Sequence, residues 1–149
     1  PTGAGSAGLE LRYLYNHNAF LDPYRYNSVM PAAHDNPKPL LWVGSAKKDL
    51  QSMPDEVQDT FGYALHLAQT GGKHAQAKPL KGFGSAGVLE VVESEAGSTY
   101  RAVYTVKIAN AVYVLHCFQK KSTSGIATPK PDMDLVHDRL KAALAHAAQ

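Results

Sequence analysis

Basic residues gather in one segment of this chain, in a pattern suited to binding a phosphodiester. Between residues 73 and 130 there are eight Lys or Arg against three acids, a net charge of +5, whereas the whole chain carries +2. A local excess of positive charge attracts polyanions, and phosphate is the commonest polyanion that a small protein meets. The segment therefore predicts a phosphate-bearing partner.

Arg101, Lys120 and Lys121 are candidates for the catalytic groups of metal-free RNA cleavage. This reaction uses the ribose 2′-hydroxyl as nucleophile, and it needs a base, cations around the phosphorane and an acid for the departing 5′-oxygen. A guanidinium stays charged and can grip two phosphate oxygens, which suits Arg101. Lys120 and Lys121 alternate across a strand, so only one of them points into a given face. A lysine can serve as an acid at neutral pH, but as a base only if its pKa is lowered.

His116 is a further candidate for proton transfer, because the pKa of an imidazole lies near neutrality. Strand alternation puts it on the face of Phe118 and Lys120, opposite Lys121. A hydrogen-bonded histidine near the core is the structural alternative. The other histidines are scattered without metal-ligand spacing, so no metal site is predicted.

Lys78, Lys81 and Tyr104 are candidates for RNA contacts outside the catalytic centre. The two lysines precede the cationic strands, and a tyrosine can stack on an RNA base. Structural alternatives remain for all of these basic and aromatic residues. Arg101 could pair across strands with a glutamate, Lys120 and Lys121 could protect a strand edge from aggregation, and the two earlier lysines could border a flexible loop. Tyr104 is first of all a strand former.

Three helices are expected to support these strands. A short helix capped by Ser45 is predicted to end near Met53, and Pro54 fits the first position of a second helix that Gly71-Gly72 ends. Both this helix and a last helix near the C-terminus have apolar residues at helical spacing. The predicted stripe of the second helix is Val57, Phe61, Ala64, Leu65 and Ala68, and that of the last helix is Met133, Val136, Leu140, Ala143 and Leu144.

Four strands are expected between these helices. The apolar run 40–43 predicts the first strand, and segments 88–93, 100–107 and 111–119 predict a meander whose short turns force antiparallel pairing. The order β-α-α-β-β-β-α predicts an α+β fold, a compact domain with its helices packed on one face of a small antiparallel sheet.

The chain is expected to consist of an extension, residues 1–37, followed by one domain, residues 38–149. Met30 is followed by a polar segment of the kind that often begins a domain. Residues 1–29 are therefore interpreted as an upstream or artificially added segment. The alternative is a genuine arm that packs on a partner. Cys117 is the only cysteine, which excludes an internal disulfide. No apolar run reaches the roughly 18 residues of a membrane span, and no signal peptide is visible, so a cytoplasmic location without membrane contact is expected.

Several phrases of the sequence resemble a family. The runs AKPLKGFG, YRAVYTV, VYVLHCFQKK and GIATPK, in this order of elements, are similar to the RelE/HigB superfamily of bacterial toxins, and most of all to its phage-related HigB-type branch. The resemblance covers roughly residues 39–145 and leaves residues 1–37 outside. It implies a RelE-like compact domain with a cleft lined by Lys and Arg.

This resemblance implies the toxin of a type II toxin–antitoxin system. Such toxins commonly cleave mRNA on the ribosome without a metal or an organic cofactor, and a helix-turn-helix antitoxin of the HigA type silences them. Arg101 matches the strand arginine that faces the scissile phosphate, Lys121 with its neighbour Lys120 matches the basic end of the third meander strand, and Lys81 matches a basic loop residue. The match favours Lys121 as the catalytic partner of Arg101.

Two departures from the family pattern keep alternatives open. The first meander strand has Glu90 near a position where the best-known relatives carry a lysine, and no tyrosine follows Tyr113, so the base-stacking tyrosine of some members is missing. A gyrase-poisoning toxin of the ParE branch and a catalytically inactive relative that binds RNA or regulates its own operon are the alternative functions. The cationic strands argue against the gyrase poison, because poisoning by protein contact needs no phosphate-gripping arginine.

Overall fold

A computed structural model describes residues 9–12, 37–120 and 127–149 of the chain. Its elements follow the order β-β-α-α-β-β-β-β-α, which confirms an α+β fold. They are β1 (Leu9–Arg12), β2 (Leu40–Val43), α4 (Ala46–Gln51), α5 (Asp55–Gln69), β3 (Lys78–Pro79), β4 (Val88–Glu95), β5 (Ser98–Ile108), β6 (Ala111–Lys120) and α6 (Lys130–Ala147).

The strands form one mixed sheet in the order β1-β2-β6-β5-β4-β3. The predicted antiparallel meander is confirmed as β4, β5 and β6. The prediction of a wholly antiparallel sheet is wrong, because β2 pairs with β6 in parallel. Two helices and three strands separate β2 from β6 in the chain, so no short turn forces these two to be antiparallel.

Two-residue turns set the register of the meander. Ala96 and Gly97 join β4 to β5, Ala109 and Asn110 join β5 to β6, and all four have φ between 51° and 82°. Positive φ at both central residues is typical of the type I′ turns that match the twist of antiparallel strands. These turns place each side chain of one strand opposite a defined side chain of the next.

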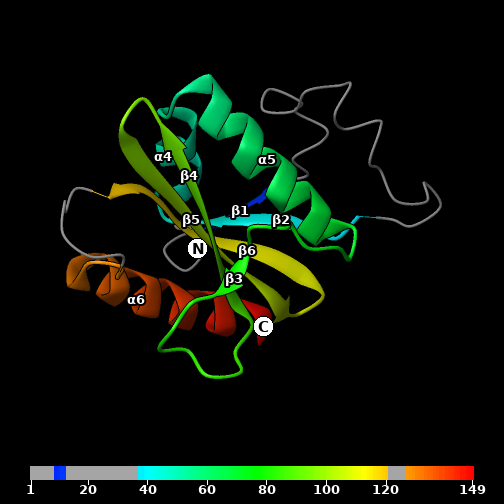
Figure 1. Ribbon diagram of the computed structural model, residues 1–149. Helices are drawn as coiled ribbons and strands as arrows, with labels where there is room; N and C mark the ends of the chain where they lie inside the picture. Colours follow the sequence, from blue (N-terminus) through cyan, green and yellow to red (C-terminus); the bar gives the residue numbers. More distant parts are fainter. Residues whose placement is uncertain (1–8, 13–36, 121–126) are drawn as a thin grey trace.

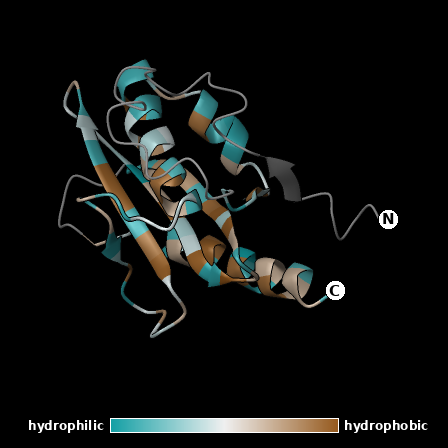
Figure 2. Cartoon of the chain, turned by 90° about the vertical axis from the view of Figure 1, so that its right-hand side faces the viewer, coloured by the Kyte–Doolittle hydropathy of each residue, from teal (hydrophilic) through white to brown (hydrophobic). Residues whose placement is uncertain are grey.

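Helices cover both faces of the sheet, so the prediction that they pack on one face is wrong (Figure 1). One core cluster joins α4 and α5 to the sheet through residues such as Leu50, Phe61 and Tyr104, and the other joins α6 through Val136 and Ala143. The physical reason lies in β6, whose first eight residues are all buried. A strand that is apolar on both faces needs cover on both sides, and Figure 2 shows hydrophobic stretches on the strands and on the helices that cover them.

The helices follow their predicted stripes except at Leu144, and one predicted helix cap is absent. All five apolar residues predicted for α5 are buried, whereas Leu144 of α6 is 50 % exposed and does not belong to the buried side of its helix. Ser45 makes no side-chain cap, because its hydroxyl donates to Oδ2 of Asp49 at 2.7 Å instead.

The predicted domain 38–149 corresponds to the elements from β2 to α6, with the addition of the short edge strand β3. Within the predicted extension 1–37, β1 pairs with β2 in antiparallel orientation. Met30 and most of the extension lie outside the described residues, so their origin stays a prediction. No helix in the described ranges has both the length and the apolar composition to span a bilayer.

Candidate functional site

Glu90, Arg101 and Thr128 form a hydrogen-bonded cluster on the sheet face that α6 covers. Glu90 of β4 lies opposite Val103 of β5, two residues from Arg101, so both charged side chains project from one face. Nη1 of Arg101 donates to Oε2 of Glu90 at 3.0 Å and to Oγ1 of Thr128 at 3.3 Å, and Thr128 donates to the same Glu90 oxygen at 3.1 Å. This Glu90–Arg101–Thr128 cluster ties two strands to the segment that leads into α6.

Arg101 is held inside this cluster, with 6 % of its surface exposed. The alternative of a cross-strand glutamate partner is confirmed by its ion pair with Glu90. The conformation therefore does not present Arg101 as an open phosphate ligand. A buried guanidinium needs a partner for its charge, and Glu90 supplies it.

His116 lies on the same face and contacts α6. Its Nε2 is 2.8 Å from Oδ1 of Asp132, and its ring stacks on Phe118 with ring centroids 4.4 Å apart. Burial lowers the pKa of His116; the hydrogen bond that its ring donates to Asp132 opposes this shift, and the positive charge of Arg139 adds to it. The alternative of a hydrogen-bonded histidine near the core is thus confirmed. A lowered pKa leaves less of the imidazole protonated at neutral pH, which disfavours His116 as the acid for a leaving group.

A pocket of about 360 Å³ opens beside His116, between α4 and β6. Asp49, Tyr100 and Gln119 also line it. In the part of the chain that the structure describes, no three His, Cys, Asp or Glu side chains lie close enough together to hold a metal ion.

The predicted lysines differ in where they lie relative to this face. Lys78 of β3 is exposed and lies directly opposite Glu90, so it shares the face of the cluster. Lys81 is exposed in the turn after β3, and Lys120 ends β6 on the face of His116. Lys121 lies outside the described residues, so its pairing with Arg101 stays a prediction.

Tyr104 does not belong to the site, and its prediction as an RNA-stacking residue is wrong. It is fully buried in the cluster of α4 and α5, and burial raises the pKa of its hydroxyl. Its side chain points to the opposite face from Arg101 because the two are three positions apart on one strand. A base cannot reach a ring that the core encloses.

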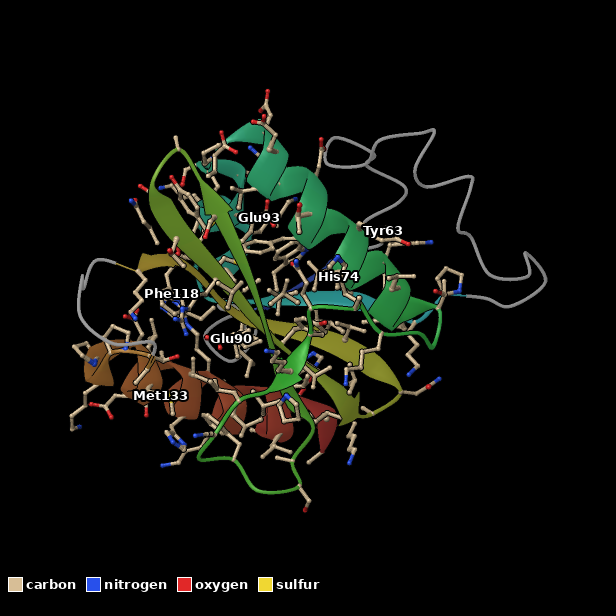
Figure 3. All side chains as sticks on the ribbon, viewed as in Figure 1. Tyr63, His74, Glu90, Glu93, Phe118 and Met133 are labelled. Atoms are coloured by element: carbon tan, nitrogen blue, oxygen red, sulfur yellow. The ribbon has the colours of Figure 1, made fainter. Side chains whose placement is uncertain are left out.

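The sheet thus brings together most of the predicted basic residues and adds Glu90 to them. Lys78, Glu90, Arg101, His116 and Lys120 come from four neighbouring strands and share one face. In the sequence, Glu90 stands out only as a departure from a family pattern. The signal that identifies Glu90 is the two-residue turn after Glu95. This turn sets the register that places Glu90 diagonally across from Arg101 on the next strand. In Figure 3, Glu90 and Phe118 lie on the side of α6, near Met133 of that helix.

Comparisons with known proteins place this site in a family. A search of curated proteins and a search of solved structures found no significant match. The model of one protein family, described as phage derived protein Gp49-like (DUF891), matches residues 48–141. The match spans more than half of the chain and includes Glu90, Arg101, His116 and Asp132. The family consists of toxin-like proteins that are associated with toxin–antitoxin systems. On this evidence the chain belongs to the Gp49-like family of phage derived proteins.

Proposed function

We propose that this protein is the toxin of a type II toxin–antitoxin system and a metal-independent endoribonuclease of the RelE/HigB type. Its substrate is mRNA, cleaved at the ribosome in the cytoplasm. The family membership supports a toxin, and the resemblance of the strand motifs supports the nuclease class. The observation that carries the proposal is the face on which Glu90, Arg101, Lys78 and Lys120 converge.

Glu90 and Arg101 supply complementary parts of the reaction. The Glu90 carboxylate takes the proton of the ribose 2′-hydroxyl, whose oxygen then attacks the adjacent phosphorus. The bond from phosphorus to the 5′-oxygen breaks, which leaves a 2′,3′-cyclic phosphate and a 5′-hydroxyl end. The Arg101 guanidinium stabilises the charge on the phosphorane oxygens. Because Arg101 is bonded to Glu90 in the free protein, RNA has to take over one side of this ion pair.

Lysines guide RNA to this face and provide the proton for the leaving 5′-oxygen. Lys78 and Lys81 are exposed at one edge of the sheet, where they attract the RNA backbone. Lys120 ends β6 on the face that carries Arg101 and is the proposed acid, and Lys121 follows it in the chain. A helix-turn-helix antitoxin of the HigA type silences the toxin when it covers this face or blocks entry into the ribosome.

Induction of the full chain in bacteria, followed by mapping of mRNA ends, tests this function. We expect translation to stop and messages to acquire new 5′-hydroxyl ends. Arg101→Lys retains a charge for Glu90 but loses the planar fork, and Glu90→Gln retains the shape but loses the base. Each of these variants, and Lys120→Ala, should restore growth and remove the new ends.

Matched substitutions away from the face control for general damage. Glu56→Gln on α5 and Lys141→Ala on α6 are exposed and should remain toxic. Purified variants must also keep the circular dichroism of the parent chain. Intact messages together with double-strand DNA breaks would assign the protein to the gyrase-poisoning class, and absence of any growth effect would assign it to the inactive relatives.

A further inference from the structure

The outer edge of β4 has hydrogen-bonding groups that no described strand pairs with. The edge strand β3 pairs only with Leu89 and Glu90. Its pairing extends no further because the chain turns away from the sheet just before β3, in a turn closed by a hydrogen bond from Ala77 N to His74 O. Val88 O accepts a bond from Leu80 N on this outer side. Backbone groups of alternate residues point to the same side of a strand. The N–H and C=O groups of Val92 and Ser94 therefore point outward along an edge that is open among the described residues.

A pocket of about 390 Å³ lies beside this edge, on the sheet face that α5 covers. Tyr63 from α5, His74 from the turn and Glu93 from β4 are among its lining residues, and Figure 3 shows these three side chains on the α5 side of the sheet. The Tyr63 and His74 rings meet edge to face with centroids 5.7 Å apart. Glu93 makes no ion pair with any other part of the described chain.

The chemistry of this pocket is suited to a cationic side chain. A carboxylate next to aromatic rings attracts an ammonium or guanidinium group through charge and through cation–π contact. Nδ1 of His74 accepts a hydrogen bond from Gln76 N at 3.0 Å, so a neutral His74 carries its proton on Nε2. Glu95 follows two residues after Glu93 and adds negative charge on the same face.

We propose that this edge binds an extended basic segment of a protein partner as an additional β-strand, with a Lys or Arg side chain in the Glu93 pocket. Glu93 turns its own backbone groups toward β5, so the residue opposite it presents only a side chain to the pocket. The neighbours of that residue on either side bond to Val92 and Ser94. Backbone bonds supply binding, and Glu93 selects the charge. The site lies on the opposite face from Glu90 and Arg101 and does not depend on RNA cleavage.

A capped five-residue peptide, Thr-Val-Lys-Val-Thr, probes the site on the full-length protein. We expect it to shift the amide NMR signals of Val92 and Ser94 and to slow their hydrogen exchange. A peptide with Glu in place of Lys should bind at least about tenfold more weakly, because the central charge then repels Glu93. N-methylation of both valines should abolish binding, whereas N-methylation of the lysine should not, since only the valine amides face the edge.

Substitutions in the protein test the same contacts from the other side. Glu93→Gln should weaken binding of the lysine peptide at least about tenfold, and Glu56→Gln serves as its matched control. Ser94→Pro removes one outward N–H without breaking the ladder to β5, because proline is tolerated on edge strands, and it should abolish binding. If Ser94→Pro does not fold, the N-methylated peptides still decide the question.

Three results would overturn the proposal. One is the absence of shifts at Val92 and Ser94 at millimolar peptide, and another is equal binding of the lysine and glutamate peptides. The third is a concentration-dependent dimer, seen by sedimentation, that Ser94→Pro removes while no peptide binds. That result would assign the edge to a second copy of this chain. Loss of toxicity in Glu90 or Arg101 variants has no bearing on these outcomes.

Discussion

At the scale of single residues, Glu90 and Arg101 hold each other in place. Arg101 is 6 % exposed, and the Glu90 carboxylate 3.0 Å away is the acidic partner that the described structure gives it. A buried charge that loses its partner is strongly destabilising, whereas loss of both partners costs less than the sum of the single losses. The pair is therefore a structural element as well as a candidate reaction centre.

Glu90→Ala should lower the free energy of unfolding by about 3 kcal/mol, because it leaves the Arg101 guanidinium buried without its acid. Urea denaturation of Glu90→Ala, Arg101→Ala and the double variant measures the coupling, which we expect to be at least about 1 kcal/mol. Effects that add to within about 0.5 kcal/mol would contradict the pairing. This stability assay separates the structural role of the pair from its role in toxicity.

At the scale of elements, two tight turns set the register on which both sites depend. Ala109, with φ of 52°, is one of three non-glycine residues of the described chain in the left-handed region. This conformation costs a residue with a Cβ about 1 kcal/mol, whereas glycine adopts it without strain. The hairpin between β5 and β6 therefore forms in spite of its turn residue, and the packing of the buried strands offsets the strain.

Ala109→Gly should raise the free energy of unfolding by roughly 0.5–1 kcal/mol, because it relieves the strain in this turn. The matched control is Ala142→Gly, at an exposed position inside α6, which should lower it by about 1 kcal/mol. Thermal and urea denaturation of both variants measure these opposite signs. A destabilised Ala109→Gly variant would show that the left-handed conformation is not the one present in solution.

At the scale of the whole molecule, the sheet separates two chemically different surfaces. The α6 face carries the Glu90–Arg101–Thr128 cluster, His116 and the exposed Lys78, whereas the α5 face carries the acidic Glu93 pocket. Both surfaces depend on a core that is closed on each side by helices. His66 of α5 is part of the buried interior and couples the stability of this core to pH.

Burial lowers the pKa of His66 to about 4, from an ordinary value of 6.5. The folded state therefore binds fewer protons than the unfolded chain between these pH values. The contribution of the neutral imidazole to the free energy of unfolding is fully present above about pH 6.5. As the pH falls toward 4 this contribution is lost, and the loss amounts to about 3 kcal/mol in total. Urea denaturation at several pH values should show a flatter profile for His66→Leu than for the parent chain. An unchanged slope in His66→Leu would contradict this assignment.

Sequence patterns predicted the elements correctly where local signals determine them. The apolar stripe of α5, the run at 40–43 and the three meander strands each depend on spacing within one segment, and all are present. The short turns also required antiparallel neighbours, which the meander confirms. The candidate site was predicted only in part. The sequence identifies Arg101, His116 and the lysines as residue types and offers a glutamate for Arg101, but it does not identify Glu90 or Asp132 as the partners.

Only the tertiary structure decided which of these residues meet. The parallel pairing of β2 with β6 and the helices on both faces arise from contacts between segments far apart in the chain, which no local period encodes. The same contacts buried Tyr104, joined His116 to Asp132 and placed Arg101 against Glu90 rather than in the open. Residue chemistry is a property of the sequence, whereas the burial and the partners that tune that chemistry come from how strands and helices pack.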